Sequence, residues 1–254
     1  MIDIHCHILP AIDDVPAEAA ESVAMAKTAA ADGIRSIVAT PHFSYGDGPD
    51  IEAIERAKRA LEERLKEDRV HVGLVCGADV RLTYELFEGI EKGDLPTING
   101  SRYFLLELPE IIPPNLDNFL HAASIGGFVP IITHPERNYS FLASPRKMDG
   151  LREAGALIQI TAMSITGEFG MKIEGFSEAL IRKGLVDFVA TDAHGTGHRR
   201  PVLSAAYNHL TQLLDKGQMR KIFFENPEAV LENREIKVKG EAVFAPCPLP
   251  LTLL

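Results

Sequence analysis

Seven short apolar runs recur along this chain, and longer amphipathic stretches lie between them. The runs are Ile2–His5, Ser36–Thr40, Val70–Cys76, Tyr103–Glu107, Val129–Thr133, Leu157–Thr161 and Phe188–Thr191. Gly, Pro or polar residues bound each run, as is typical of buried parallel strands. The intervening stretches, among them Ile51–Asp68 and Val202–Lys216, have helical patterns. Strands that alternate with helices in this way predict an α/β fold with a parallel sheet.

The sheet could be open or closed into a barrel, and the positions of the polar residues favour the barrel. The chain has no Gly-x-Gly-x-x-Gly after its first strand and no phosphate-binding Walker loop. Polar residues gather instead at the carboxyl ends of the strands, where barrel enzymes place their sites. We therefore expect a TIM-like barrel of seven β/α units over residues 1–234. Residues 235–254 differ, because they contain three prolines and carry no charge after Glu241.

The first strand ends in two histidines that share one face. Side chains of a strand alternate between its faces, so Asp3, His5 and His7 project to one side and the isoleucines of this segment to the other. Imidazole nitrogen is the commonest side-chain metal ligand near neutral pH. The pair therefore predicts two ligands for one metal ion, although two histidines without a metal are the alternative for this pair alone.

Histidines and carboxylates also follow or end other predicted strands. The segment Asp192-Ala193-His194 repeats the spacing of two ligands on one face. Glu107 follows three apolar residues of a buried strand, where an unpaired carboxylate is costly, so it needs a cation partner. One such residue is weak evidence, but six of the seven strands end this way. The candidate metal ligands are His5, His7, Asp14, His42, Asp79, Glu107, His134, Asp192 and His194. His198 lies on a loop and stays open.

Ligands of this mixed type point to metal-assisted chemistry. Imidazole together with carboxylate suits Zn, Mn or Fe better than Ca or Mg. The candidates are too many for one tetrahedral ion, so several ions bridged by carboxylates are expected. Clusters of this kind hydrolyse phosphate esters, because bound metal makes hydroxide available near neutral pH and neighbouring ions clamp the phosphoryl oxygens.

Composition argues against several other classes of protein. The net charge of −10 opposes binding to a nucleic-acid backbone. No apolar run approaches the roughly 20 residues that span a membrane, and the first residues lack the basic segment of a secretory signal, so a cytoplasmic protein is expected. Cysteine-based phosphatases need a Cys-x5-Arg motif, but Ile12 and Leu82 stand at the sixth position after Cys6 and Cys76.

With these motifs the chain resembles the PHP (polymerase and histidinol phosphatase) superfamily. It is most similar to the bacterial PHP-type tyrosine-protein phosphatases of capsule and exopolysaccharide loci. The matching segments are Ile2–Asp14, Ala39–His42, Gly77–Val80, Pro96–Leu108, Thr133–Arg137 and Thr191–Arg199. Their order and spacing extend the resemblance over residues 1 to about 232.

The resemblance implies a distorted barrel that holds three divalent metal ions, in this branch typically Mn²⁺, with Fe or Zn as alternatives. The implied ligand sets are His5, His7, Asp79 and Asp192 for one ion, Asp79, Glu107 and His134 for a second, and Asp14, His42 and His194 for a third. Arg137 and Arg199 match arginines that hold the substrate phosphate in this family. Because Arg200 is adjacent, the register of the second arginine stays open.

Asp79 departs from the family pattern, which usually has glutamate at this position. Aspartate is one methylene shorter, so its carboxylate reaches about 1.5 Å less far. Either the backbone moves inward here or the metal bridge is weaker. The departure therefore bears on metal occupancy and on rate more than on the fold.

The implied function is hydrolysis of phosphotyrosine by a hydroxide that bridges the metal ions. The substrate would be the tyrosine-rich tail of an autophosphorylating bacterial tyrosine kinase. Two alternatives stay open. A small-molecule phosphoesterase acting on a compound such as histidinol phosphate would share the metal site, and a weakly catalytic metal-binding protein would act as a regulatory partner of the export machinery.

Overall fold

The structure is a computed structural model that describes residues 1–12, 16–46, 48–93 and 95–237. Its strands are β1 (Ile2–Cys6), β2 (Ser36–Ala39), β3 (His42–Phe43), β4 (Gly73–Cys76), β5 (Asp79–Arg81), β6 (Tyr103–Glu107), β7 (Val129–Thr133), β8 (Leu157–Thr161) and β9 (Phe188–Ala190). Its α-helices are α1 (Ala19–Ala31), α2 (Ile51–Glu67), α3 (Leu86–Lys92), α4 (Leu116–Ile125), α5 (Tyr139–Ala143), α6 (Lys147–Glu153), α7 (Ala162–Ile165), α8 (Met171–Arg182), α9 (Ser204–Leu210), α10 (Lys216–Arg220) and α11 (Asn226–Leu231). Each of the seven predicted strands is present.

The strands form two parallel sheets, in the orders β1-β2-β4 and β3-β5-β6-β7-β8-β9. The chain passes from β2 directly into β3 and from β4 directly into β5, so the sheets follow one another. At the opposite edge an isolated bridge pairs Cys6 with Ala193, and His7 N donates to Ala193 O at 2.9 Å. The predicted α/β fold with parallel strands is confirmed. Closure into one barrel stays a prediction, because the ladder is interrupted at these junctions.

Two of the predicted strands are each followed, after a break in the ladder, by a short strand that was not predicted, β3 after β2 and β5 after β4, so the described residues contain nine strands where seven were expected. Pro41 separates β2 from β3, and proline has no N–H to donate to a ladder. Gly77 follows β4, and a Cβ there would lie 2.7 Å from Cγ1 of Val38, so this close approach requires glycine. Beyond the breaks, His42 and Asp79 become register partners in β3 and β5. The interruptions therefore place two candidate ligands side by side.

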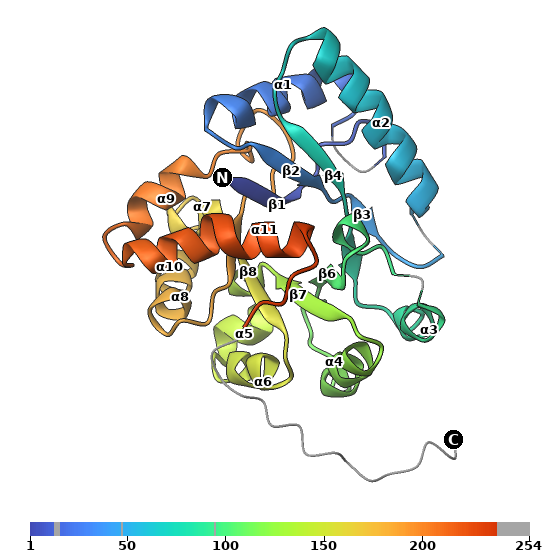
Figure 1. Cartoon of the computed structure of the whole chain (residues 1–254). Coiled ribbons are helices and arrows are strands. Elements are labelled where there is room, and N and C mark those ends of the chain that lie inside the picture. Colours follow the sequence, from blue (N-terminus) through green and yellow to red (C-terminus); the bar gives the residue numbers. More distant parts are fainter. Residues whose placement is uncertain (13–15, 47, 94, 238–254) are drawn as a thin grey trace.

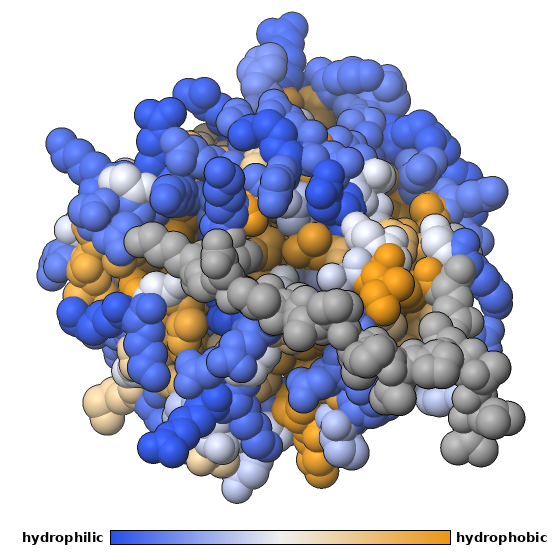
Figure 2. Space-filling view, turned by 60° about the horizontal axis from the view of Figure 1, so that its bottom comes forward, coloured by the Kyte–Doolittle hydropathy of each residue, from blue (hydrophilic) through white to orange (hydrophobic). Residues whose placement is uncertain are grey.

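Helices lie around the strands (Figure 1), with α1 and α2 beside the β1-β2-β4 sheet. Helix α2 shows why: Ile54, Leu61 and Leu65 are buried, at helical spacing, and the other faces carry charged residues. Hydrophilic residues cover most of the face drawn in Figure 2, with smaller hydrophobic areas between them. Among the described residues no helix has both the length and the apolar character needed to cross a membrane.

The segment from Val202 to Lys216 was expected to be one helix, and that expectation was wrong. Helix α9 ends at Leu210, and α10 begins at Lys216. Asp215 starts the second helix with a capping box: its carboxylate accepts from Gln218 N at 2.9 Å, and Gln218 Oε1 accepts from Asp215 N at 3.0 Å. The cap satisfies backbone donors that a continuous helix would have paired internally.

Replacing this cap should produce a small and local loss of stability. Asp215→Ala removes the acceptor for Gln218 N and should lower the free energy of unfolding by about 1 kcal/mol. Urea denaturation followed by circular dichroism measures the change. Lys216→Ala, next to it, is the matched control and should stay within about 0.5 kcal/mol of wild type. Equal stability of both variants would show that the cap contributes nothing.

Of the expected tail, residues 235–254, the structure describes only residues 235–237. Tyr103 Oη donates to Arg234 O at 2.7 Å and accepts from Ile236 N at 3.1 Å, which ties residues 234–236 to strand β6. Residues 238–254 lie outside the described part of the chain. The domain boundary after residue 234 therefore stays a prediction.

Candidate metal centre

Eight of the nine candidate ligands meet at one place, at or just beyond the carboxyl ends of strands. Their ligand atoms form four groups, and within each group all of the atoms lie within 4.8 Å of one another. The groups are His7, His42 and His194; His5, Asp79 and His134; His5, His7 and Asp192; and His42, Asp79 and Glu107. Because the groups share members, they form a single cluster. The ninth candidate, Asp14, lies outside the described residues.

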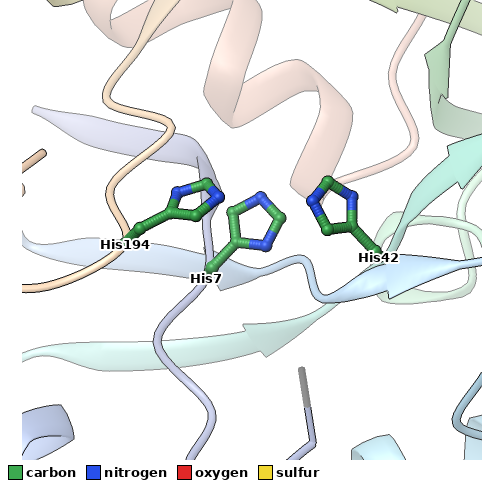
Figure 3. A group of neighbouring side chains, drawn as sticks. All are labelled: His7, His42 and His194. Atoms are coloured by element: carbon green, nitrogen blue, oxygen red, sulfur yellow. The ribbon is translucent and has the colours of Figure 1, made fainter. Parts of the chain in front are cut away.

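Three imidazoles of the cluster approach one another from different parts of the chain (Figure 3). His7 lies between the other two, with its ring centroid 3.9 Å from that of His194 and 4.5 Å from that of His42. The resemblance had assigned His7 to a different ion from His42 and His194. The geometry brings all three close enough to share one ion, so the division of ligands among ions stays a prediction.

Asp79 lies at the centre of the cluster and is fully buried. Its Oδ2 is 3.6 Å from His5 Nε2 and 3.5 Å from His42 Nδ1, yet it has no hydrogen bond of normal geometry. Burial alone would raise the pKa of this carboxyl, but the surrounding histidines, with His5 and His42 foremost, together outweigh burial and lower the pKa below its ordinary value. A buried, ionised and incompletely satisfied oxygen requires a cation, which fits a divalent metal ion at this position.

Three histidines of the cluster, His5, His134 and His194, are held in the neutral form that binds metal. Burial lowers the pKa of His134 to about 3, and the nearby Arg137 adds to the shift. Burial and the adjacent His7 lower the pKa of His194 to about 3 as well. Burial also lowers the pKa of His5. A neutral imidazole has a lone pair available for a metal ion.

Two of the candidate ligands adopt a strained backbone conformation directly after buried strands. His134 has φ of 37° and Asp192 has φ of 50°, in the left-handed region that residues other than glycine rarely occupy. Asp192 N donates to His5 O at 2.8 Å, which holds this turn against β1. Such strain persists only where the surroundings enforce it, and it clusters at functional sites.

Asp192 connects the cluster to the two candidate phosphate-binding arginines. Its Oδ1 lies 3.4 Å from His5 Nε2 and 3.5 Å from His7 Nε2. Its Oδ2 accepts from Arg137 at 2.6 Å and lies 2.5 Å from an Arg199 nitrogen. The carboxylate therefore faces the cluster with one oxygen and both guanidinium groups with the other.

A pocket of about 590 Å³ opens over these groups. Its lining includes His42, Glu107, His134, Asp192 and His194, together with Arg137 and Arg199. Arg200 instead lines a separate small cavity that also contains His198. Of the two arginines left open by the sequence, Arg199 is thus the one at the pocket, and His198 lies outside the cluster.

Comparison with known proteins agrees with this geometry. The family model of capsular polysaccharide synthesis proteins CpsB/CapC matches residues 1–232. The chain belongs to the CpsB/CapC family. This confirms the resemblance to capsule-locus phosphatases. The tyrosine-protein phosphatase YwqE of Bacillus subtilis is 34% identical over 253 residues, which cover 99% of this chain and 96% of YwqE. The tyrosine-protein phosphatase CpsB of Streptococcus pneumoniae is 29% identical and covers 93% of this chain and all of CpsB.

Solved structures agree with the family assignment. One solved structure comes from a description of YwqE from Bacillus subtilis and CpsB from Streptococcus pneumoniae as unique metal-dependent tyrosine phosphatases. It matches this CpsB/CapC protein with a TM-score of 0.88 at 34% identity. The match covers 93% of this chain and 96% of that one. The phosphotriesterase from Mycobacterium tuberculosis matches with a TM-score of 0.54 at 12% identity, which shows likeness of fold alone.

Several residues that contact the candidate ligands of this CpsB/CapC protein and hold them in place were not predicted from the sequence. Gln159 Oε1 accepts from His5 Nδ1 at 2.9 Å, which leaves Nε2 of that ring for a metal ion. Thr133 Oγ1 donates to Asp79 Oδ1 at 3.2 Å. Gln159 was detectable, because it is the only amide in the apolar run Leu157–Thr161 and a buried amide needs partners.

Two further charged contacts of the CpsB/CapC site also went unpredicted. Arg81 Nε donates to Glu107 Oε2 at 2.9 Å at the side of the pocket. Asp3 is fully buried and accepts from Thr191 N and Thr191 Oγ1 at 2.9 Å and 2.5 Å. Asp3 thereby fastens β1 to the segment that carries Asp192.

Proposed function

We propose that this CpsB/CapC protein is a metal-dependent protein-tyrosine phosphatase whose cluster holds three divalent metal ions, with Mn²⁺ as the native metal and Fe or Zn as alternatives. The observation that supports the proposal is the overlap of four ligand groups beside two arginines in one pocket. A single-ion site would not need so many shared ligands. The names of the similar proteins support phosphotyrosine as the substrate.

Some residues of the chain would hold the metal ions, and others would bind the substrate phosphate. When bound, divalent ions at this cluster would supply Lewis-acid stabilisation of phosphoryl charge and a more acidic water. Gln159, Thr133 and Arg81 hold a histidine and two carboxylates of the cluster in fixed orientations. Preorganised ligands of this kind need no rearrangement during the reaction.

Arg137 and Arg199 would bind the phosphoryl oxygens. Both side chains lie at the pocket, and both contact Asp192, a carboxylate of the cluster. The guanidinium of Arg137 also lies 5.1 Å from the ring centroid of Phe169, which restricts its orientation. Planar guanidinium groups bind phosphate through paired hydrogen bonds, so two of them can fix its position.

Removing Arg137 should damage catalysis without removing the cluster. Arg137→Ala should lower kcat/KM for a phosphotyrosine peptide, and the decrease should correspond to a loss of about 2–4 kcal/mol in transition-state stabilisation. Arg137→Lys keeps the charge but loses the paired geometry, so it should recover only part of the rate. Steady-state kinetics with equal metal loading measure both variants. A normal kcat/KM in Arg137→Ala would assign this residue a structural role.

The substrate class is tested by comparing three phosphate esters. With Mn²⁺ present, the protein should hydrolyse p-nitrophenyl phosphate and a phosphotyrosine peptide, and should prefer the peptide to histidinol phosphate. Preference for histidinol phosphate would favour the small-molecule phosphoesterase instead. No hydrolysis of any ester by metal-loaded protein would favour a metal-binding regulatory protein.

Several finer expectations rest on this proposal. The phosphotyrosine-bearing partner would be the tail of a membrane-associated tyrosine kinase, and the reaction would take place in the cytoplasm. We also infer that the two parallel sheets act as one distorted seven-position barrel, because the segments β2–β3 and β4–β5 each occupy one position. Isolation of the kinase tail with a metal-loaded, inactive variant would test the partner.

A further inference from the structure

Three large apolar side chains stand exposed around one side of the pocket. Tyr84 is 79% exposed, Ile111 is 83% exposed and Tyr139 is 68% exposed. Each directly follows a residue that lines the pocket, namely Thr83, Glu110 and Asn138. A single exposed apolar side chain needs no explanation, but three beside one pocket form a surface with a shared position. We call these three residues the apolar rim.

The apolar rim follows the order of the sheet. Tyr84 and Ile111 lie on the loops after β5 and β6, and Tyr139 is the first residue of α5, which follows β7; these three strands are neighbours in the six-stranded sheet. The loops are also fixed to one another. Tyr139 N donates to Glu110 Oε2 at 3.2 Å, and Asn138 Nδ2 donates to Pro109 O at 2.9 Å. Leu82 N donates to Glu107 O at 2.9 Å, which ties the first loop to the second strand.

The chemistry of the pocket indicates what covers this surface. Arg81, Arg137 and Arg199 line the pocket and suit an anionic phosphate group. The rim begins where the lining of the pocket ends. It can therefore contact the peptide residues on either side of a phosphorylated residue that is inserted in the pocket. Tyrosine is enriched in protein interfaces, because its ring gives contact area and its hydroxyl can hydrogen-bond. A small phosphate ester held by these arginines has no flanking chain to contact the rim.

We propose that the apolar rim is a docking surface for the peptide segment that carries the phosphotyrosine, and that it selects segments with apolar or aromatic side chains next to that residue. The inference rests on the proposed function and adds a recognition element to it. The phosphate is held by the arginines, and the flanking side chains pack on Tyr84, Ile111 and Tyr139. Selection then depends on sequence around the phosphotyrosine and not on the phosphate alone.

The test measures binding and needs no turnover. Two peptides carry a non-hydrolysable phosphonomethyl-phenylalanine, one flanked by leucine and phenylalanine and the other by glycine and serine. Fluorescence anisotropy should give a dissociation constant for metal-loaded wild type about tenfold lower for the apolar peptide. The triple variant Tyr84→Ser, Ile111→Ser, Tyr139→Ser should lose this preference and keep its affinity for the glycine-serine peptide.

A matched control lies at the other end of the strands. Ile125 is 74% exposed at the end of α4, ahead of the start of β7, so Ile125→Ser should retain the tenfold preference. Equal affinity of wild type for both peptides, or a preference that survives in the triple variant, would overturn the docking surface. Failure of wild type to hydrolyse phosphotyrosine would overturn the proposed function instead, and the binding result would still decide on the rim.

Discussion

Treatment with EDTA should lower hydrolysis of a phosphotyrosine peptide by a factor on the order of 1,000 or more, since the metal supplies most of the rate enhancement in this account. The chain itself offers few alternatives for the chemistry. Two histidines at the pocket, His134 and His194, are held neutral, because burial lowers the pKa of each to about 3.

Mn²⁺ should restore the lost activity better than Mg²⁺, because imidazole-rich sites bind Mg²⁺ poorly. The measurement is initial rate against added metal, after removal of the chelator. Circular dichroism of the EDTA-treated protein serves as the control and should show that the fold persists, because the apolar core does not depend on the cluster. Full activity in protein shown by elemental analysis to lack metal would contradict the mechanism.

Asp79→Ala should lose both metal and activity, with kcat again reduced on the order of 1,000-fold. Asp79 is fully buried between His5 and His42, and its Oδ2 has no other partner of normal hydrogen-bond geometry. Removing the carboxylate leaves neutral histidines without the negative charge that attracts divalent ions. Metal content per chain and kcat on the same preparations measure the effect.

Asp79→Glu separates a metal bridge from a general need for negative charge. If Asp79 bridges two ions, the longer side chain restores the usual family geometry, and metal content or kcat should equal or exceed wild type. Asp149→Ala, at an exposed position in the first turn of α6, is the matched control and should change stability by no more than about 0.5 kcal/mol. Retention of all metal in Asp79→Ala would refute the bridge.

The strands could be predicted because each buried strand is a local apolar run. The breaks after β2 and β4, and the short strands β3 and β5 that follow them, could not be predicted, because they depend on contacts between strands. Gly77 is required only because Val38 lies against it, and the sequence places these residues far apart. The division of α9 from α10 was missed for a different reason: the apolar pattern continues across the turn, and only the cap at Asp215 shows where the new helix begins.

The candidate site could be predicted to the extent that its residues stand at strand ends. Residues that orient them from other strands carry no such mark. Arg81 reads as an ordinary exposed arginine until β5 is paired with β6, where it reaches Glu107. Of the seven predicted strands, only the one that became β8 neither contains a candidate ligand nor is followed by one. It supplies Gln159, which accepts a hydrogen bond from His5, so all seven predicted strands contribute to the site.

The location of the metal is the central claim, and anomalous diffraction from a crystal of the Mn²⁺-loaded protein tests it most directly. Data collected at the manganese absorption edge should show peaks at the cluster, each about 2.0–2.3 Å from histidine nitrogens or carboxylate oxygens. Peaks are expected beside the ligand groups, such as His5, Asp79 and His134, because the ligand atoms of each group already lie together. A crystal of active, metal-loaded protein with manganese elsewhere, and none at these residues, would contradict the account.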